Sequence, residues 1–122
     1  MPWYDPSKKL SKQLEAALAK AYPGINLNTN HVFTFEALLV AADAYKRAAS
    51  TDPKALAEAI RKTNIIDNVS VGPGIQFDAK GQNDKLKNSA IQNRGGKLVT
   101  VAPKVASNAK PELPMSPYDK RG

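Results

Sequence analysis

The sequence predicts a mixed α/β chain with about three helices, a short β-hairpin and an irregular, proline-rich tail. Apolar residues recur at helical spacing in three segments before Asn64, and Asp-Pro or Pro-Gly pairs punctuate these segments. Strand-like runs then flank Gly95 and Gly96, which is a hairpin signal. From Ala102 onward, prolines interrupt a stretch without periodicity. We therefore divide the chain into residues 1–101 and an extended tail, residues 102–122.

The composition narrows the classes of function. The chain has 122 residues, which fits one domain, and it lacks cysteine. That absence excludes disulfides, thiolate metal ligands and a cysteine nucleophile. No apolar run reaches the length of a membrane span, and no signal peptide is visible, so we expect no membrane insertion. The net charge of +7 comes from scattered lysines without interleaved aromatic residues, so a solvated basic surface is favoured over a nucleic-acid site.

The first helix is predicted to follow Asp5-Pro6. Aspartate is a good N-cap and proline suits the first helical turn, so we expect Asp5 to cap this helix. Leucines 10, 14 and 18 form a narrow apolar stripe, and the lysines, including Lys8, are expected in solvent. Pro23-Gly24 would end this amphipathic surface helix. The asparagine-rich stretch 25–30 is predicted to be a loop.

Residues 31–50 form the segment around which the rest must be arranged. Val32–Phe35 is predicted to be extended, with Thr34 as the N-cap of a helix that follows. The helix would be apolar around most of its girth in its first half, which is typical of a helix covered on more than one side. Its main stripe consists of Leu38, Ala41, Ala42, Tyr45 and Ala49. This helix therefore needs a large apolar partner surface.

The remaining elements are short. Thr51 or Asp52 is predicted to cap a third helix, with Pro53 in its first turn and an end near Thr63-Asn64. The VGPG run within residues 67–74 breaks regular structure, and Ile75–Asp78 alternates as a strand does. Residues 86–93 and 97–101 are the predicted strands of the hairpin. Together these parts supply too little sheet to cover the central helix, so we expect a piece of a larger α/β protein or an oligomer.

Several runs also resemble a known family when they are taken as an ordered set. These runs are FEALLVAADAYKRAASTDPKALAEAIRKTN, VGPGIQFDAKGQND and IQNRGGKLVTVAP. They resemble the C-terminal third of the branched-chain amino-acid (Leu/Ile/Val-type) solute-binding proteins of ABC importers. Trp3–Pro6 and the following helix look like the segment that re-enters the first lobe in these proteins. The resemblance covers roughly residues 1–103.

The resemblance implies a partial type I periplasmic-binding-protein fold, in which two α/β lobes close on a small ligand. This chain would supply first-lobe helices and the closing hairpin. The intact protein would be periplasmic, would hold a branched-chain amino acid or a related small carboxylate, and would deliver it to an ABC permease. No cofactor, metal, nucleic acid or enzymatic activity is implied. The isolated chain is expected to bind ligand poorly and to form a homo-oligomer.

The candidate ligand-binding residues lie at the start of the central helix. A helix N-terminus has unpaired N–H groups and a partial positive charge, which suit a carboxylate ligand. The resemblance places a ligand-contacting side chain at Asn30, and His31 and Phe33 are further candidates for the pocket wall. The alternative for all three is an ordinary loop or core role. One histidine, no cysteine and no recognisable carboxylate pair argue against a catalytic site.

A second hypothesis belongs to a different class of function. The scattered lysines and the proline-rich tail could make the chain a stand-alone basic interaction module that binds nucleic acid or a protein partner. Binding of this kind to a polyanion would weaken steeply as salt is added. Salt-independent behaviour would therefore favour the solute-binding hypothesis.

Overall fold

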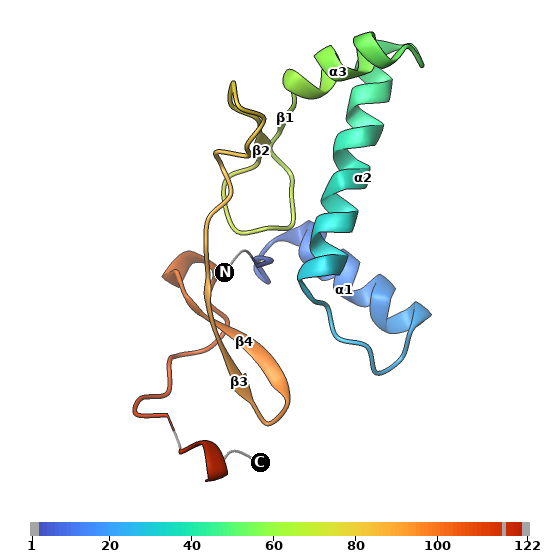
Figure 1. Ribbon diagram of the computed structural model, residues 1–122. Helices are drawn as coiled ribbons and strands as arrows, with labels where there is room; N and C mark the ends of the chain where they lie inside the picture. Colours follow the sequence, from blue (N-terminus) through green and yellow to red (C-terminus); the bar gives the residue numbers. More distant parts are fainter. Residues whose placement is uncertain (1–2, 116, 121–122) are drawn as a thin grey trace.

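The computed structural model describes residues 3–115 and 117–120. The described chain is mixed α/β, as predicted, with three α-helices followed by two separate two-stranded antiparallel sheets (Figure 1). The helices are α1 (Lys9–Ala21), α2 (Thr29–Ala48) and α3 (Pro53–Arg61). The sheets pair β1 (Asn64–Ile65) with β2 (Ile75–Gln76) and β3 (Ala90–Arg94) with β4 (Lys97–Ala102). Two short 3-10 helices follow, η1 (Lys104–Ala106) and η2 (Tyr118–Lys120).

The N-terminal segment is extended where the sequence predicted the start of a helix. The Asp5 N–H donates to the Val69 carbonyl at 2.8 Å, and the Val71 N–H donates to the Trp3 carbonyl at 2.9 Å. The Asp5 carboxylate accepts from the N–H and hydroxyl of Ser7, which closes a local turn. The prediction that Asp5 caps α1 is therefore wrong, because pairing with a distant segment fixes its backbone before the helix begins.

The core lies where this segment, α1 and the start of α2 meet. Its buried members are Trp3, Tyr4, Leu27, Val32 and Val69. The partly buried side chains packed against it are Leu10, Leu14, Leu18, Phe35 and Ile91. The leucine stripe predicted for the first helix thus faces the core. The Trp3 and Tyr4 rings pack at a tilt of 46° with centroids 5.2 Å apart, a favourable aromatic geometry.

Helix α2 begins earlier than predicted because Asn28 caps it. The Asn28 Oδ1 accepts from the N–H groups of Asn30 and His31, and the Asn28 N–H donates to the His31 Nδ1 at 3.2 Å. This reciprocal arrangement is a capping box. Val32–Phe35 is therefore helical, and the predictions of an extended run and of Thr34 as the cap are wrong. The predicted loop 25–30 is correspondingly shorter, since Thr29 and Asn30 belong to α2.

The apolar stripe predicted for α2 is only partly covered. Val32, Glu36 and Ala44 are its buried residues, whereas Leu38 is 64% exposed and Tyr45 is 52% exposed. The stripe was expected to be buried, and in this chain much of it faces solvent. The expectation that the remaining residues cannot cover the helix is confirmed by these exposures.

The shorter elements form where their local sequence signals predict them, although their bounds differ. The Asp52 carboxylate caps α3 by accepting from the Ala55 N–H at 2.9 Å, and Pro53 is the first helical residue, as predicted. The helix ends at Arg61, before the predicted end. The hairpin is present with its turn at Gly95 and Gly96, although β3 begins at Ala90 instead of residue 86. Only the first two residues of the strand predicted from Ile75 belong to β2.

The approach of β2 to β1 depends on Gly74. A Cβ added there would lie 2.3 Å from the Ile65 carbonyl oxygen, and the φ angle of Gly74 is +157°. Gly81 also has a positive φ, +78°, but a Cβ there would meet nothing within 4 Å.

We predict that Gly74→Ala lowers the free energy of unfolding by about 3 kcal/mol and Gly81→Ala by about 1 kcal/mol, because only the first adds a clash to the backbone strain. Urea denaturation measures both losses, and equal losses would contradict the close β1–β2 approach.

Candidate functional site

The buried carboxylate of Glu36 fastens an irregular segment to α2. Its Oε1 accepts from the Val69 N–H at 3.0 Å, the Ser70 N–H at 2.7 Å and the Asn68 Nδ2 at 3.2 Å. Its Oε2 accepts from the Ser70 hydroxyl at 3.0 Å. Glu36 is only 6% exposed, and charge-assisted hydrogen bonds of this kind offset the loss of hydration. Its carboxylate therefore serves the fold.

Lys8 extends this polar network to the start of α1. Its Nζ donates to the Asn68 Oδ1 at 2.5 Å and to the carbonyl oxygens of Ser70 at 2.8 Å and Gly72 at 2.6 Å. Burial lowers the pKa of Lys8, and nearby carboxylates, among them that of Glu36, oppose that shift. Lys8 was predicted to belong to the solvated basic surface. It instead satisfies buried carbonyl groups, which removes it from any polyanion-binding patch.

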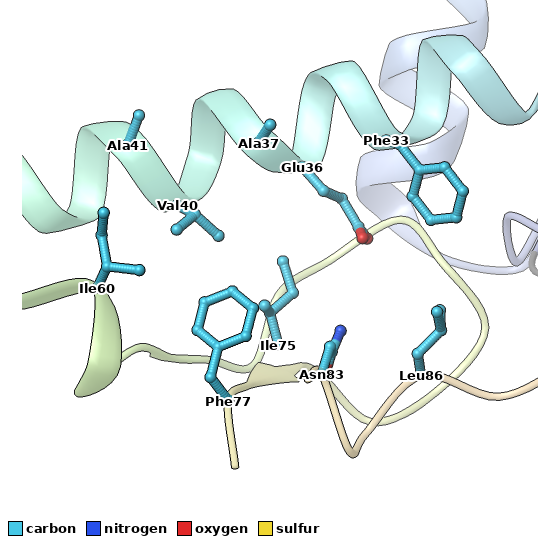
Figure 2. Close-up of a pocket in the computed structure, with 10 residues that line it drawn as sticks. All are labelled: Phe33, Glu36, Ala37, Val40, Ala41, Ile60, Ile75, Phe77, Asn83 and Leu86. Atoms are coloured by element: carbon cyan, nitrogen blue, oxygen red, sulfur yellow. The ribbon is translucent and has the colours of Figure 1, made fainter. Parts of the chain in front are cut away.

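An apolar groove lies beside Glu36, between α2 and the segment around β2 (Figure 2). Its volume is about 360 Å³. The lining residues are Phe33, Glu36, Ala37, Val40, Ala41, Ile60, Ile75, Phe77, Asn83 and Leu86. Figure 2 shows Val40, Ile75 and Phe77 pointing toward one another across it. The Asn83 Oδ1 accepts from the N–H groups of Gln76 and Lys85, so this groove offers apolar surface and no evident acid–base chemistry.

The structure separates the three predicted ligand-binding residues. Phe33 is 39% exposed and lines the groove of Figure 2. Asn30 and His31 line a different hollow of about 300 Å³, where leucines of α1 face α2. Asn30 is exposed, and the Nδ1 of His31 is engaged by the capping box. Asn30 and His31 therefore share a surface, and Phe33 lies apart from them.

Three N–H groups at the N-terminus of α2 are already satisfied within the chain. The Asn28 side chain accepts from the N–H groups of Asn30 and His31, and the Asn28 carbonyl accepts from the Val32 N–H at 3.2 Å. The sequence predicted that unpaired N–H groups here would receive a ligand carboxylate. These three groups are not available, because the preceding asparagine takes them first.

Residues that the sequence analysis overlooked make the polar network. Glu36, Asn68 and Ser70 are buried, and the stretch 67–74 was interpreted only as a break in regular structure. One signal was present in the sequence. Between Asn30 and Asp43, Glu36 is the single carboxylate in an otherwise apolar run, and His31 is the one other ionisable residue there. A lone carboxylate in such a run indicates a buried acceptor with a specific set of donors.

Direct indicators of function are few. Within residues 3–115 and 117–120, no group of three or more histidine, aspartate and glutamate side chains is placed to hold a metal ion. In the same part of the chain, none of the helices is both long and apolar enough to cross a membrane. A scan against protein-family models found no match to this chain, and neither did a search of curated proteins.

Replacing Glu36 tests the network. We predict that Glu36→Ala lowers the free energy of unfolding by at least about 3 kcal/mol, because two main-chain N–H groups and two side-chain donors lose a charged acceptor. Glu36→Gln keeps the size and one acceptor oxygen, so its loss should be smaller. Glu58→Ala, at an exposed position on α3, is the matched control and should stay within about 0.5 kcal/mol. A Glu36→Ala loss no larger than that of Glu58→Ala would contradict the role of the carboxylate.

Tyr4 should make the stability of the fold sensitive to alkaline pH. Its hydroxyl donates to the Glu15 Oε1 at 2.7 Å, and burial, reinforced by Glu15, raises the pKa of Tyr4 above its ordinary value. The unfolded chain would release this proton above about pH 10 while the folded chain keeps it, so stability should fall as pH rises further. We predict that, between pH 10 and pH 11, the free energy of unfolding of Tyr4→Phe falls by about 1 kcal/mol less than that of wild type. Urea denaturation at the two pH values measures both falls. Tyr22→Phe, at a 63% exposed position, should follow wild type.

Proposed function

We propose that this chain forms part of a solute-binding protein of an ABC importer, of the branched-chain amino-acid type. The intact protein would hold a branched-chain amino acid or a related small carboxylate between two lobes in the periplasm. Closure of the lobes about a hinge would create the form that the membrane permease recognises. The described helices and the hairpin would contribute to a type I periplasmic-binding-protein fold.

The observation that carries this proposal is the uncovered apolar face of α2. Leu38 and Tyr45, which lie about 20° apart around the helix, are 64% and 52% exposed. Soluble monomers rarely leave large contiguous apolar patches in water. In α/β proteins, a helix with such a face is covered by a sheet. A further layer supplied by the rest of a two-lobed protein would account for this surface.

The local structure of the matching motifs gives further support. Asp52-Pro53 starts α3 with a side-chain cap. The run GPGIQFDAKGQND forms β2 and a turn in which the Asp78 Oδ1 accepts from the N–H groups of Lys80 and Gln82. The run IQNRGGKLVTVAP contains most of the β3–β4 hairpin. The start of α3, the turn after β2 and the hairpin therefore lie in the runs on which the resemblance rests.

Asn30 is the residue of choice for a ligand contact in the intact protein. It lies on the exposed surface of the first turn of α2, and its side chain is not part of the cap. We predict that Asn30→Ala in the intact protein weakens leucine binding by about tenfold, because a side-chain hydrogen bond to the ligand is lost. Isothermal titration calorimetry measures the affinity, with exposed Asn88→Ala as the control. Unchanged affinity would remove Asn30 from the site.

The size of the protein in its source cells tests the proposal itself. Immunoblotting with an antibody raised against this chain should detect a species well above 122 residues in the exported fraction. A species of 122 residues in the cytosol would overturn the proposal. In that case, salt-sensitive retention of the chain on a polyanion column would favour the basic interaction module.

A further inference from the structure

One face of β3 holds a distant segment of the chain by its main-chain groups. Gln92 is buried, at 9% exposure, and its Nε2 donates to the Glu112 carbonyl at 3.0 Å. Its Oε1 accepts from the Glu112 N–H at 3.0 Å. A side-chain amide has the same donor and acceptor as a peptide unit. Gln92 therefore pairs with Glu112 as one strand pairs with another in an antiparallel ladder.

Arg94 continues the same face, since residues two apart in a strand point to the same side. Its Nη2 donates to the Lys110 carbonyl and to the Gln92 Oε1, which holds the amide in place. Its Nη1 lies 3.3 Å from the Glu112 carboxylate. That carboxylate side chain is 70% exposed, so this ion pair contributes little. Most of the recognition is directed at the main chain of Lys110–Glu112.

Apolar burial contributes little to holding this segment. Pro111 is exposed and Leu113 is 79% exposed. The segment enters through Asn108, whose N–H donates to the Thr100 carbonyl at 3.0 Å and whose Oδ1 accepts from the Thr100 N–H at 2.9 Å. The tail was predicted to be irregular and extended, and these polar contacts hold it against β3 and β4.

We propose that Gln92 and Arg94 form a docking site for an extended peptide main chain, and that Lys110–Glu112 occupies it as a tethered ligand. The site reads one N–H and two carbonyl groups, so an extended peptide main chain fits it, and an acidic residue at the position of Glu112 adds only a weak ion pair. The short tether gives the segment a high effective concentration at the site. A peptide from another molecule therefore binds only when the segment is displaced. This proposal is independent of the solute-binding function.

The full-length variant Glu112→Pro opens the site without changing it. Proline lacks the N–H that the Gln92 Oε1 accepts, while Gln92 and Arg94 are intact. The probe is a fluorescein-labelled peptide of residues 107–115, SNAKPELPM, and fluorescence anisotropy measures its affinity. We expect the peptide to bind Glu112→Pro at least about tenfold more tightly than wild type, because loss of the hydrogen bond from the residue-112 N–H weakens the tethered competitor. Addition of Gln92→Leu should abolish that binding, and addition of Gln13→Leu, at an exposed position on α1, should not.

Proteolysis tests the tethered state in wild type. A glutamate-specific endoprotease cuts after Glu112 only when the segment is released. We expect Gln92→Leu to speed this cleavage at least about fivefold while Gln13→Leu leaves it unchanged. Gln92→Glu has the shape of glutamine, but its ionised side chain cannot donate to the Glu112 carbonyl, so it should speed the cleavage as well. This variant replaces Gln92→Leu if circular dichroism shows that the leucine variant is unfolded. Equal peptide affinity for wild type and Glu112→Pro, or cleavage insensitive to residue 92, would overturn the proposal.

Discussion

The buried carboxylate of Glu36 determines how the chain folds around α2. A charge in a protein interior is strongly unfavourable unless donors surround it. The donors here come from Asn68, Val69 and Ser70, a segment without regular structure whose N–H groups would otherwise be buried and unpaired. The same hydrogen bonds therefore satisfy both the buried carboxylate and the buried N–H groups of the segment. The same segment pairs with Trp3–Asp5, so the core around Trp3 and Val69 depends on the carboxylate being in place.

This arrangement gives α2 a covered face and an exposed face. Val32, Glu36 and Ala44 lie on the covered face and are buried. Leu38 and Tyr45 lie about 180–200° around the helix from Glu36 and keep much of their surface in solvent. Adding apolar cover to the exposed face would stabilise the molecule without disturbing the Glu36 network. The exposed face is therefore where a further layer of structure fits best.

Sequence reasoning succeeded where the cause of a structure lies within a few residues of it. The cap at Asp52-Pro53 and the turn at Gly95 are examples. It failed where two local signals compete, because Asn28, and not Thr34 as predicted, is the N-cap of α2. That error also split the predicted site. His31 and Phe33 share a face of a strand, but in a helix they lie about 200° apart, so they line different grooves.

Long-range pairing was beyond the reach of the sequence because no local pattern encodes it. The pairing of Asp5 with Val69 is one case, and the docking of Glu112 on Gln92 is another. Glu36 and Gln92 nevertheless share a recognisable property: each is a polar side chain at an inward-facing position of a regular element, and each satisfies the main chain of an irregular segment. Because an unpaired polar group inside a protein is unfavourable, a polar residue at a predicted core position implies a partner elsewhere in the chain. In this chain the partners are two stretches that lack periodicity, residues 68–70 and 110–112, and the polar side chains of Glu36 and Gln92 hold them in place.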